Sequence, residues 1–190
     1  MPAIKKMNWT SFKKKYGACR ECELCEGRDK IVLAKGTIPC DVLFIGEAPG
    51  ASEDVFGKPF VGPAGKLLHR VIDSALSEFS ATPKMAFTNL VCCIPRDEDG
   101  VKVHEPKKEH VQACYKRLQD FADLCDPQLI IFVGKFAEKY GGTLLMNDHL
   151  VANSISHPAA VLRADVSQQE LMAQRMEAIL IRAFNNLVPF

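Results

Sequence analysis

Residues Asp41 to Leu68 read DVLFIGEAPGASEDVFGKPFVGPAGKLL, and three patterns follow one another in them. The apolar run from Val42 to Ile45 is typical of a buried strand. A loop rich in glycine and proline comes next, and apolar residues then recur at helical spacing from Ala64 to Phe79. We therefore predict a strand, a long loop and a helix. In an open α/β sheet, ligands bind just beyond the carboxyl ends of strands, so this loop is the first candidate for a binding site.

The rest of the chain repeats this alternation of strands and helices. Further strands are predicted at residues 31–33 (short), 86–93, 129–133 and 153–157, and helices at residues 106–125 and 168–184, with a short amphipathic helix within residues 1–18. Four main strands with helices between them favour a parallel sheet. We predict an α/β fold with a four-stranded parallel sheet flanked by helices, in one domain over residues 1–190 with a cysteine-bearing N-terminal segment.

Each of the four main strands leads into a polar or glycine-rich motif. These motifs are Gly46-Glu47, Asn89 with the cysteines after it, Gly134-Lys135 and Ser156-His157. Because the carboxyl ends of parallel strands lie at one edge of a sheet, we expect the motifs to outline a single cleft.

Composition excludes some classes of protein. The chain has 24 Lys and Arg against 23 Asp and Glu, so its net charge of +1 is unlike that of a histone-type polyanion binder, although a local basic patch remains compatible with it. No apolar run is long enough to predict a membrane span, and residues 1–10 lack a signal-peptide core. We expect a cytoplasmic monomer with no protein partner evident from the sequence.

Eight cysteines are the most unusual feature of the composition. Cys19, Cys22 and Cys25 form two C-x-x-C spacings that share the middle residue. Thiols stay reduced inside cells, so we interpret these residues as ligands of a metal ion or an iron–sulfur cluster before disulfides. A redox pair or plain buried cysteines are the alternatives.

Four short motifs occur in a fixed order along the chain. They are GEAPG at residues 46–50, GKPFVG at 57–62, Thr88-Asn89, and HPAAVLR at 157–163. With the cysteines, this pattern resembles the uracil-DNA glycosylase superfamily, and specifically its iron–sulfur family 4, over residues 19–163. The resemblance implies a three-layer fold and an enzyme that flips uracil out of DNA and hydrolyses its N-glycosidic bond, leaving an abasic site.

The resemblance assigns roles in uracil binding to four residues. Gly46 and Ala48 belong to the first substrate-binding motif, and Phe60 corresponds to the aromatic residue that stacks on the flipped base. Asn89 corresponds to the reader of the base, since a carboxamide offers one donor and one acceptor to O4 and N3–H of uracil. A core phenylalanine and a turn-capping asparagine are the plainer readings.

The same resemblance implies that the catalytic residues are His157, Glu47 and Glu53. An imidazole donor at O2 of uracil would stabilise the leaving anion. Glu53 matches the acid placed near C5 of uracil. Ala48 stands where other branches of the superfamily carry a water-activating Asp, so Glu47, Glu53 or no protein base activates the water.

For DNA contacts, the resemblance points to three residues. Leu162 corresponds to the wedge that enters the duplex, and Arg163 to a phosphate contact. Lys66 lies at a helix N-terminus that would receive another phosphate. Ala159 replaces the usual Ser, which removes one phosphate contact.

For the cofactor, the resemblance implies a 4Fe–4S cluster held by Cys19, Cys22, Cys93 and Cys114, with a structural role. Cys25 or Cys92 could replace one of these four ligands, and Cys40 and Cys125 fall outside the pattern. Zinc in the same thiolate cage is the rival, because both centres accept four cysteines.

The segment between Cys93 and Cys114 is longer than family 4 leads us to expect. It contains His104, which resembles the nucleophilic histidine of the DNA-crosslinking branch called UdgX, and this gives an alternative function of covalent capture. An exposed loop histidine is the favoured reading. Two further alternatives are a catalytically silent iron–sulfur DNA-binding relative and an iron–sulfur electron carrier.

Overall fold

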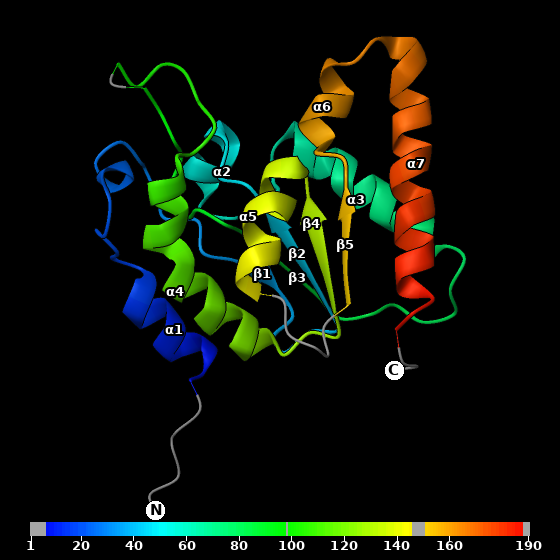
Figure 1. Ribbon diagram of the computed structural model, residues 1–190, viewed down its shortest axis with the longest axis horizontal. Coiled ribbons are helices and arrows are strands. Elements are labelled where there is room, and N and C mark those ends of the chain that lie inside the picture. Colours follow the sequence, from blue (N-terminus) through cyan, green and yellow to red (C-terminus); the bar gives the residue numbers. More distant parts are fainter. Residues whose placement is uncertain (1–6, 98, 146–150, 188–190) are drawn as a thin grey trace, which may run out of the picture.

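One mixed sheet forms the centre of the structure (Figure 1). The computed structural model describes residues 7–97, 99–145 and 151–187. The strand order is β1-β3-β2-β4-β5, in which β1 is antiparallel to β3 and the other pairs are parallel. The strands are β1 (Lys35–Gly36), β2 (Val42–Gly46), β3 (Met85–Asn89), β4 (Leu129–Val133) and β5 (Val151–Ile155).

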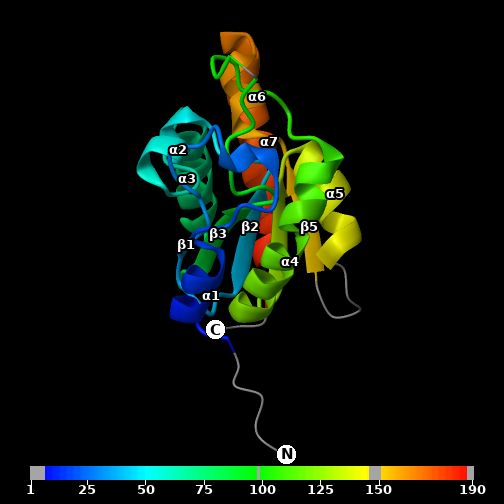
Figure 2. The same ribbon diagram turned by 90° about the vertical axis from the view of Figure 1, so that its left-hand side faces the viewer.

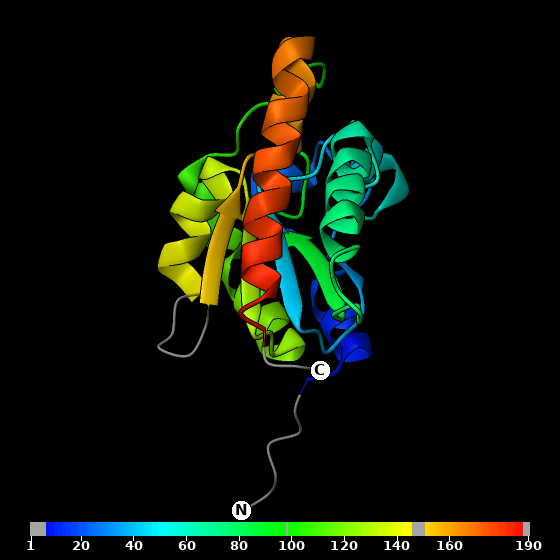
Figure 3. The ribbon, with the colours of Figure 1, turned by 90° about the vertical axis from the view of Figure 1, so that its right-hand side faces the viewer.

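Helices cover both faces of this sheet. On one face lie α1 (Trp9–Tyr16), α4 (Lys108–Cys125) and α5 (Lys135–Leu145); on the other lie α3 (Pro63–Leu76), α6 (Pro158–Arg163) and α7 (Val166–Phe184). Figure 2 shows α1 and α4 in front of the strands, and Figure 3 shows α7 in front of them with α3 beside it. Two short elements, the 3-10 helix η1 (Glu23–Cys25) and α2 (Ala51–Phe56), complete the described set.

The two layers of helices are held by the alternation of side chains along the strands. In β2, Leu43 and Ile45 pack into the core on the α4 side, whereas Val42 and Phe44 pack into the core on the α3 side. All five residues of β2 and of β4 are buried. A strand buried on both faces reads as a continuous apolar run, which is why the sequence shows these two strands so clearly.

The predicted α/β fold with four parallel strands is confirmed, and four details of the prediction are wrong. A fifth strand exists, the two-residue β1, while residues 31–33 form no strand. Strand β3 ends at Asn89 and β5 at Ile155, so the cysteines and His157 lie beyond their strands. Helix α4 begins at Lys108 rather than Pro106, because Lys107 is still extended. Three helices were not predicted, namely α2, α5 and α6.

Among the residues that the structure describes, no helix has both the length and the apolar character that a membrane crossing requires.

An aromatic cluster attaches α1 to α4. Phe121 on α4 lies 5.4 Å from Phe12 and 6.0 Å from Trp9, measured between ring centroids. Phe12 and Phe121 are both completely buried. The cluster therefore fixes the N-terminal helix next to the segment that carries Cys19 and Cys22.

We predict that Phe121→Ala lowers the free energy of unfolding by about 3–5 kcal/mol, because it leaves a cavity among these rings. Urea denaturation followed by circular dichroism measures the change. Phe56→Ala is the matched control, since Phe56 is 66% exposed on α2 and its truncation should cost less than about 0.5 kcal/mol. Equal losses in the two variants would contradict the packing described here.

Candidate active site

A cleft of about 520 Å³ opens at the carboxyl ends of the parallel strands. Its volume is within the range of about 300–1,000 Å³ that is usual for small-molecule sites. Figure 1 shows α2 and α6 at this end of the sheet. The residues that line the cleft come from four separate parts of the chain: Glu47, Ala48, Pro49, Gly50, Glu53, Phe60, Ala64, Gly65, Asn89, Pro95, Val103, His104, Glu105, His157, Ala159 and Arg163.

Phe60 lies in the cleft wall with an unusual backbone conformation. Its φ is +53°, in the left-handed region that side chains other than glycine rarely adopt. The ring is buried and packs edge-on against Phe87, with 6.0 Å between the centroids. A local conformation of this kind persists only where the surroundings hold it in place.

The carboxylate of Glu53 holds the loop after Phe60. Its Oε1 accepts hydrogen bonds from the backbone N–H of Val61 at 2.9 Å and of Gly62 at 2.8 Å, and its Oε2 accepts one from Gly50 at 3.2 Å. Both oxygens are thus engaged with backbone. Glu53 lies at the cleft as the sequence predicts. Its three hydrogen bonds hold the backbone of residues 61–62 close to Gly50.

Lys35 holds the same loop from the other side. Its Nζ donates to the carbonyl oxygen of Phe60 at 3.0 Å and lies 2.9 Å from Nε2 of His69. Burial lowers the pKa of Lys35. Gly65 completes the cradle, because a Cβ there would lie only 2.2 Å from the carbonyl carbon of Phe60.

His157 is the N-cap of α6, and this position defines its tautomer. Its Nδ1 accepts a hydrogen bond from the backbone N–H of Ala159 at 3.2 Å, so the neutral ring carries its proton on Nε2. Burial lowers the pKa of His157, the positive charge of Arg163 lowers it further, and Glu53 opposes the shift. The site therefore contains a neutral imidazole that offers an Nε2–H donor.

Gly134 leaves the space that His157 occupies. Its φ is +100°, and a Cβ there would lie 2.9 Å from Cβ of His157. The contribution of the Gly134-Lys135 motif to the site is therefore the space that Gly134 leaves for the side chain of His157.

Glu47 is the carboxyl group with the most perturbed ionisation in the cleft. Burial raises its pKa to about 7, and the negative charge of Glu105 contributes, whereas Arg163 opposes the shift. A carboxyl group with a pKa near neutrality can take up or release a proton at the pH of the cell.

Asn89 ends β3 with its side chain buried at the cleft. Strand register pairs it with Gly46 of β2. A Cβ at Gly46 would lie 2.4 Å from Oδ1 of Asn89 and 2.7 Å from Cζ of Phe60, so the missing side chain allows the amide and the ring to meet.

His104 lies on a loop that a buried ion pair anchors. Arg96 donates to Oδ2 of Asp54 at 3.0 Å, and Asp54 is completely buried. Asp54 also accepts hydrogen bonds from the backbone N–H of Asp29 and Lys30. The side chain of His104 is 57% exposed at the cleft.

The structure brings together most of the predicted site residues. Three of the predicted cleft and DNA-contact residues do not line the cleft: Gly46, Leu162 and Lys66. Gly46 is buried behind Asn89 and Phe60, whereas Leu162 is 41% exposed and Lys66 is exposed. Sequence reasoning missed Glu105, Lys35 and Asp54. Glu105 and Asp54 each lie next to a predicted site residue in the sequence, His104 and Glu53, and this adjacency could have pointed to them. Lys35 has no such neighbour.

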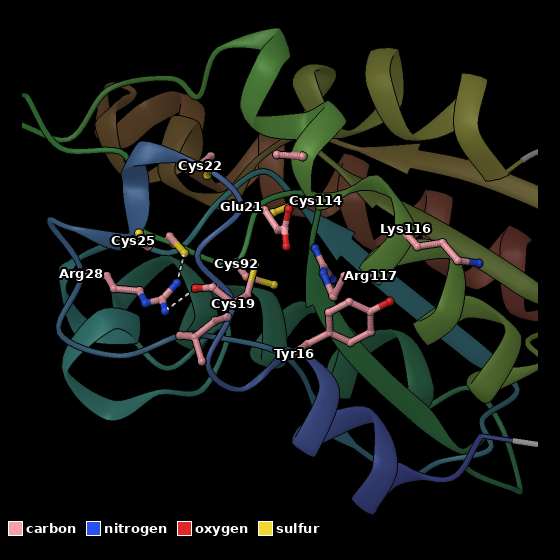
Figure 4. Close-up of a pocket in the computed structure, with 13 residues that line it drawn as sticks. Tyr16, Cys19, Glu21, Cys22, Cys25, Arg28, Cys92, Cys114, Lys116 and Arg117 are labelled. Carbon is pink, nitrogen blue, oxygen red and sulfur yellow. Dashed lines mark hydrogen bonds between the residues drawn. The ribbon is translucent and has the colours of Figure 1, made fainter.

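A second, smaller pocket of about 40 Å³ gathers most of the cysteines (Figure 4). It is lined by the four predicted ligands, Cys19, Cys22, Cys93 and Cys114, and by the two substitutes, Cys25 and Cys92. Cys40 and Cys125 lie elsewhere in the core, with the backbone N–H of Cys40 bonded to the carbonyl oxygen of Cys125 at 2.9 Å. No group of three or more His, Cys, Asp or Glu side chains in the described ranges is arranged to hold a metal ion.

Two arginines, Arg28 and Arg117, line this pocket together with the cysteines. Arg28 donates to Sγ of Cys93 at 2.9 Å and to the carbonyl oxygen of Cys19 at 2.7 Å (Figure 4). A hydrogen bond from Cys92, aided by the positive charge of Arg117, lowers the pKa of Cys114 to about 5. Burial raises the pKa of the Cys22, Cys25, Cys92 and Cys93 thiols, so these would lose their protons on binding a metal rather than beforehand. Six cysteines around one small pocket nevertheless supply the type of donor that an iron–sulfur cluster or zinc requires.

Comparison with known proteins identifies the family. Residues 34–180 match the family model described as the Uracil DNA glycosylase superfamily. The chain is 36% identical over 122 residues to the type-4 uracil-DNA glycosylase of Saccharolobus solfataricus, which covers 64% of this chain and 53% of the relative. It is 37% identical over 122 residues to that of Pyrobaculum aerophilum, covering 64% of this chain and 58% of the relative. The chain thus spans little more than half the length of these curated relatives.

A solved structure supports the fold. The chain superposes on the solution NMR structure of a candidate uracil DNA glycosylase from Methanosarcina acetivorans with a TM-score of 0.52, 13% identity, and coverage of 82% of this chain and 98% of that one. The family match covers most of the chain and confirms the resemblance drawn from its motifs. This chain belongs to the uracil DNA glycosylase superfamily, and the curated relatives it matches are type-4 members.

Proposed function

We propose that this protein is a uracil-DNA glycosylase that hydrolyses the N-glycosidic bond of uracil in DNA and leaves an abasic site. The observation that carries the proposal is the convergence of Phe60, Asn89, Glu47 and His157, from four separate segments, on one cleft. The type-4 glycosylases to which the chain is similar carry out this class of reaction by name.

Phe60 and Asn89 form the base pocket in this proposal. The ring of Phe60 stacks on the flipped uracil, and the carboxamide of Asn89 donates to O4 and accepts from N3–H. Gly46 leaves room for both groups. Ala48 lies in the wall beside them.

His157 assists departure of the base. As the bond between C1′ and N1 breaks, its electron pair passes to the uracil ring, and negative charge develops at O2. The Nε2–H of the neutral imidazole donates to this oxygen, while the N–H of Ala159 fixes the ring from the other side.

Glu47 receives the proton of the attacking water. Water adds to C1′ of the positively charged sugar and releases one proton, which the carboxylate of Glu47 accepts. A raised pKa makes this carboxylate a better base than an ordinary glutamate. Glu53 acts through the loop of Phe60, because its oxygens are engaged with backbone N–H groups.

The outer rim of the cleft contacts the DNA. Leu162 enters the space that the flipped base leaves, and Arg163 and Lys66 bind phosphates. Since the substrate is DNA, the enzyme works in the compartment that holds DNA, as the expected cytoplasmic location allows.

Cys19, Cys22, Cys93 and Cys114 would hold a 4Fe–4S cluster, with Cys25 and Cys92 beside them. When bound, such a cluster ties together the N-terminal segment, the turn after β3 and helix α4. The named functions of the relatives do not favour covalent capture by His104 or a catalytically silent protein.

His157→Ala should lower kcat by about 10²–10³, because one donor to the leaving group is lost. The assay uses a single-stranded oligonucleotide with one uracil, followed by alkali to cut abasic sites. Binding of the same oligonucleotide, measured by fluorescence anisotropy, should stay within about twofold, since base stacking remains. The proposed function fails if the wild-type protein produces no alkali-labile site.

The rate of the wild-type enzyme should rise with pH, reach half its maximum near pH 7 and level off about one pH unit higher, because the carboxyl of Glu47, whose pKa is about 7, must be ionised to accept a proton. Glu47→Gln should be about 10²-fold slower and lose this rise. The measurement is kcat/KM between pH 5 and pH 9. A rise that persists unchanged in the Gln variant would assign the titration to another group.

Glu53→Gln should raise KM roughly tenfold with a smaller change in kcat, because an amide cannot accept from three backbone N–H groups and the loop of Phe60 loosens. Steady-state kinetics on the uracil oligonucleotide measures both constants. Val55→Ala, at a half-exposed position of the same helix, is the control and should leave both unchanged. A loss confined to kcat would indicate that Glu53 acts on the reaction directly.

A further inference from the structure

Arg117 on α4 is a buried cation, 4% exposed. Its Nη1 donates to Oγ1 of Thr88 at 2.9 Å, and its Nη2 donates to the carbonyl oxygens of Asn89 at 2.6 Å and Leu90 at 2.7 Å. All three acceptors are neutral. Within the described residues, Arg117 forms no ion pair with a carboxylate, unlike Lys116, whose charge is already matched by Asp120 at 2.9 Å.

The remaining nitrogen of the guanidinium also lacks a partner. Nε of Arg117 is buried and has no hydrogen-bond acceptor in the described part of the chain. The side chain lies in the wall of the cysteine pocket, next to Cys92 and Cys114 (Figure 4). A buried charge is costly without a counter-charge. The pocket wall also contains Glu21, but its side chain is exposed, and among the described residues it forms no ion pair with Arg117. The six cysteines are the other groups of this pocket that can become anions, as thiolates bound to a metal centre.

We propose that Arg117 is a positioning residue that joins the cysteine pocket to the uracil site. On one side, its positive charge balances the thiolate-bound centre. On the other, its hydrogen bonds fix the backbone of Asn89. The second half rests on the proposed function, because it takes Asn89 as the reader of uracil.

The fold gives this link a short path. Cys114 and Arg117 are three residues apart on α4 and therefore lie on one face of the helix. Thr88 and Asn89 end β3, and Cys92 and Cys93 follow within four residues. One guanidinium thus spans from a cluster ligand to the end of the strand that carries the proposed base reader.

Arg28, the other arginine at this pocket, has a different position. It binds Cys93 and the carbonyl of Cys19 from the N-terminal segment, and it is not among the described residues that line the cleft of Phe60 and Asn89. A charge effect at the cysteines is therefore expected from both arginines, whereas an effect on uracil binding is expected from Arg117 alone.

The test compares Arg117→Met and Arg117→Lys with wild-type protein, all purified without oxygen. Iron content, visible absorbance and the midpoint potential of the iron centre are measured, together with KM and kcat for the uracil oligonucleotide.

Arg117→Met should bind iron about 10- to 100-fold more weakly or have a more negative midpoint potential, because a nearby positive charge favours the reduced centre. KM should rise roughly tenfold with a smaller change in kcat. Arg117→Lys, which keeps the charge, should restore iron binding and the potential in part.

Leu118→Ala is the matched control, since Leu118 is a fully buried neighbour on the same helix and lies outside both pockets. It should destabilise the fold and leave the midpoint potential unchanged. The proposal is overturned if wild-type protein carries no iron, if Arg117→Met has the iron content and potential of wild type, or if Leu118→Ala reproduces its shifts. Failure of the proposed function shows separately, as a wild-type protein with an iron centre and no action on uracil.

Discussion

The arrangement of the cleft depends on the absence of a side chain at Gly46. The pairing of β2 with β3 places Gly46 beside Asn89. A Cβ at position 46 would come closer to Oδ1 of Asn89 and to the ring of Phe60 than non-bonded atoms allow. The register of two parallel strands, which is set by the buried apolar residues of the sheet, therefore decides where the amide and the ring meet. The proposed base reader and the proposed stacking ring are brought together by that single close approach.

The loop of Phe60 shows how a costly conformation is held at such a site. A left-handed backbone at a residue other than glycine costs roughly 1–2 kcal/mol. Hydrogen bonds to a charged group contribute about 1.5–3 kcal/mol each. Glu53 accepts three of them from the backbone around the loop, and Lys35 donates one to the carbonyl of Phe60. These hydrogen bonds therefore outweigh the strain of the left-handed backbone and fix the position of the Phe60 ring.

The sequence predicted the parts of the site that follow buried strands, and it missed the parts that hold them. Strands β2 and β4 match the predicted bounds to within one residue, because both faces are buried and the apolar run is continuous. Helices α2 and α6 have six residues each, too few to establish a helical period. Arg117 carries no signal at all, since an arginine in a helix is normally exposed and its burial depends on tertiary packing.

Among the described residues between Asn89 and Glu105, the wall of the cleft contains one isolated bridge, between Arg96 and Val103, and no strand. Turn hydrogen bonds, such as the one from the N–H of His104 to the carbonyl oxygen of Pro95 at 2.8 Å, add to it. Two guanidinium groups contribute further contacts: the buried Arg117 binds the start of the segment, and the partly exposed Arg96 within it binds Asp54 of α2. Each also retains a buried Nε without a partner among the described residues. Apolar packing holds the sheet, whereas backbone hydrogen bonds and the bonds from these arginines hold the irregular wall. Arg117 thereby joins the backbone of the proposed base reader to the cysteine pocket, and Arg96 joins the loop of His104 to α2.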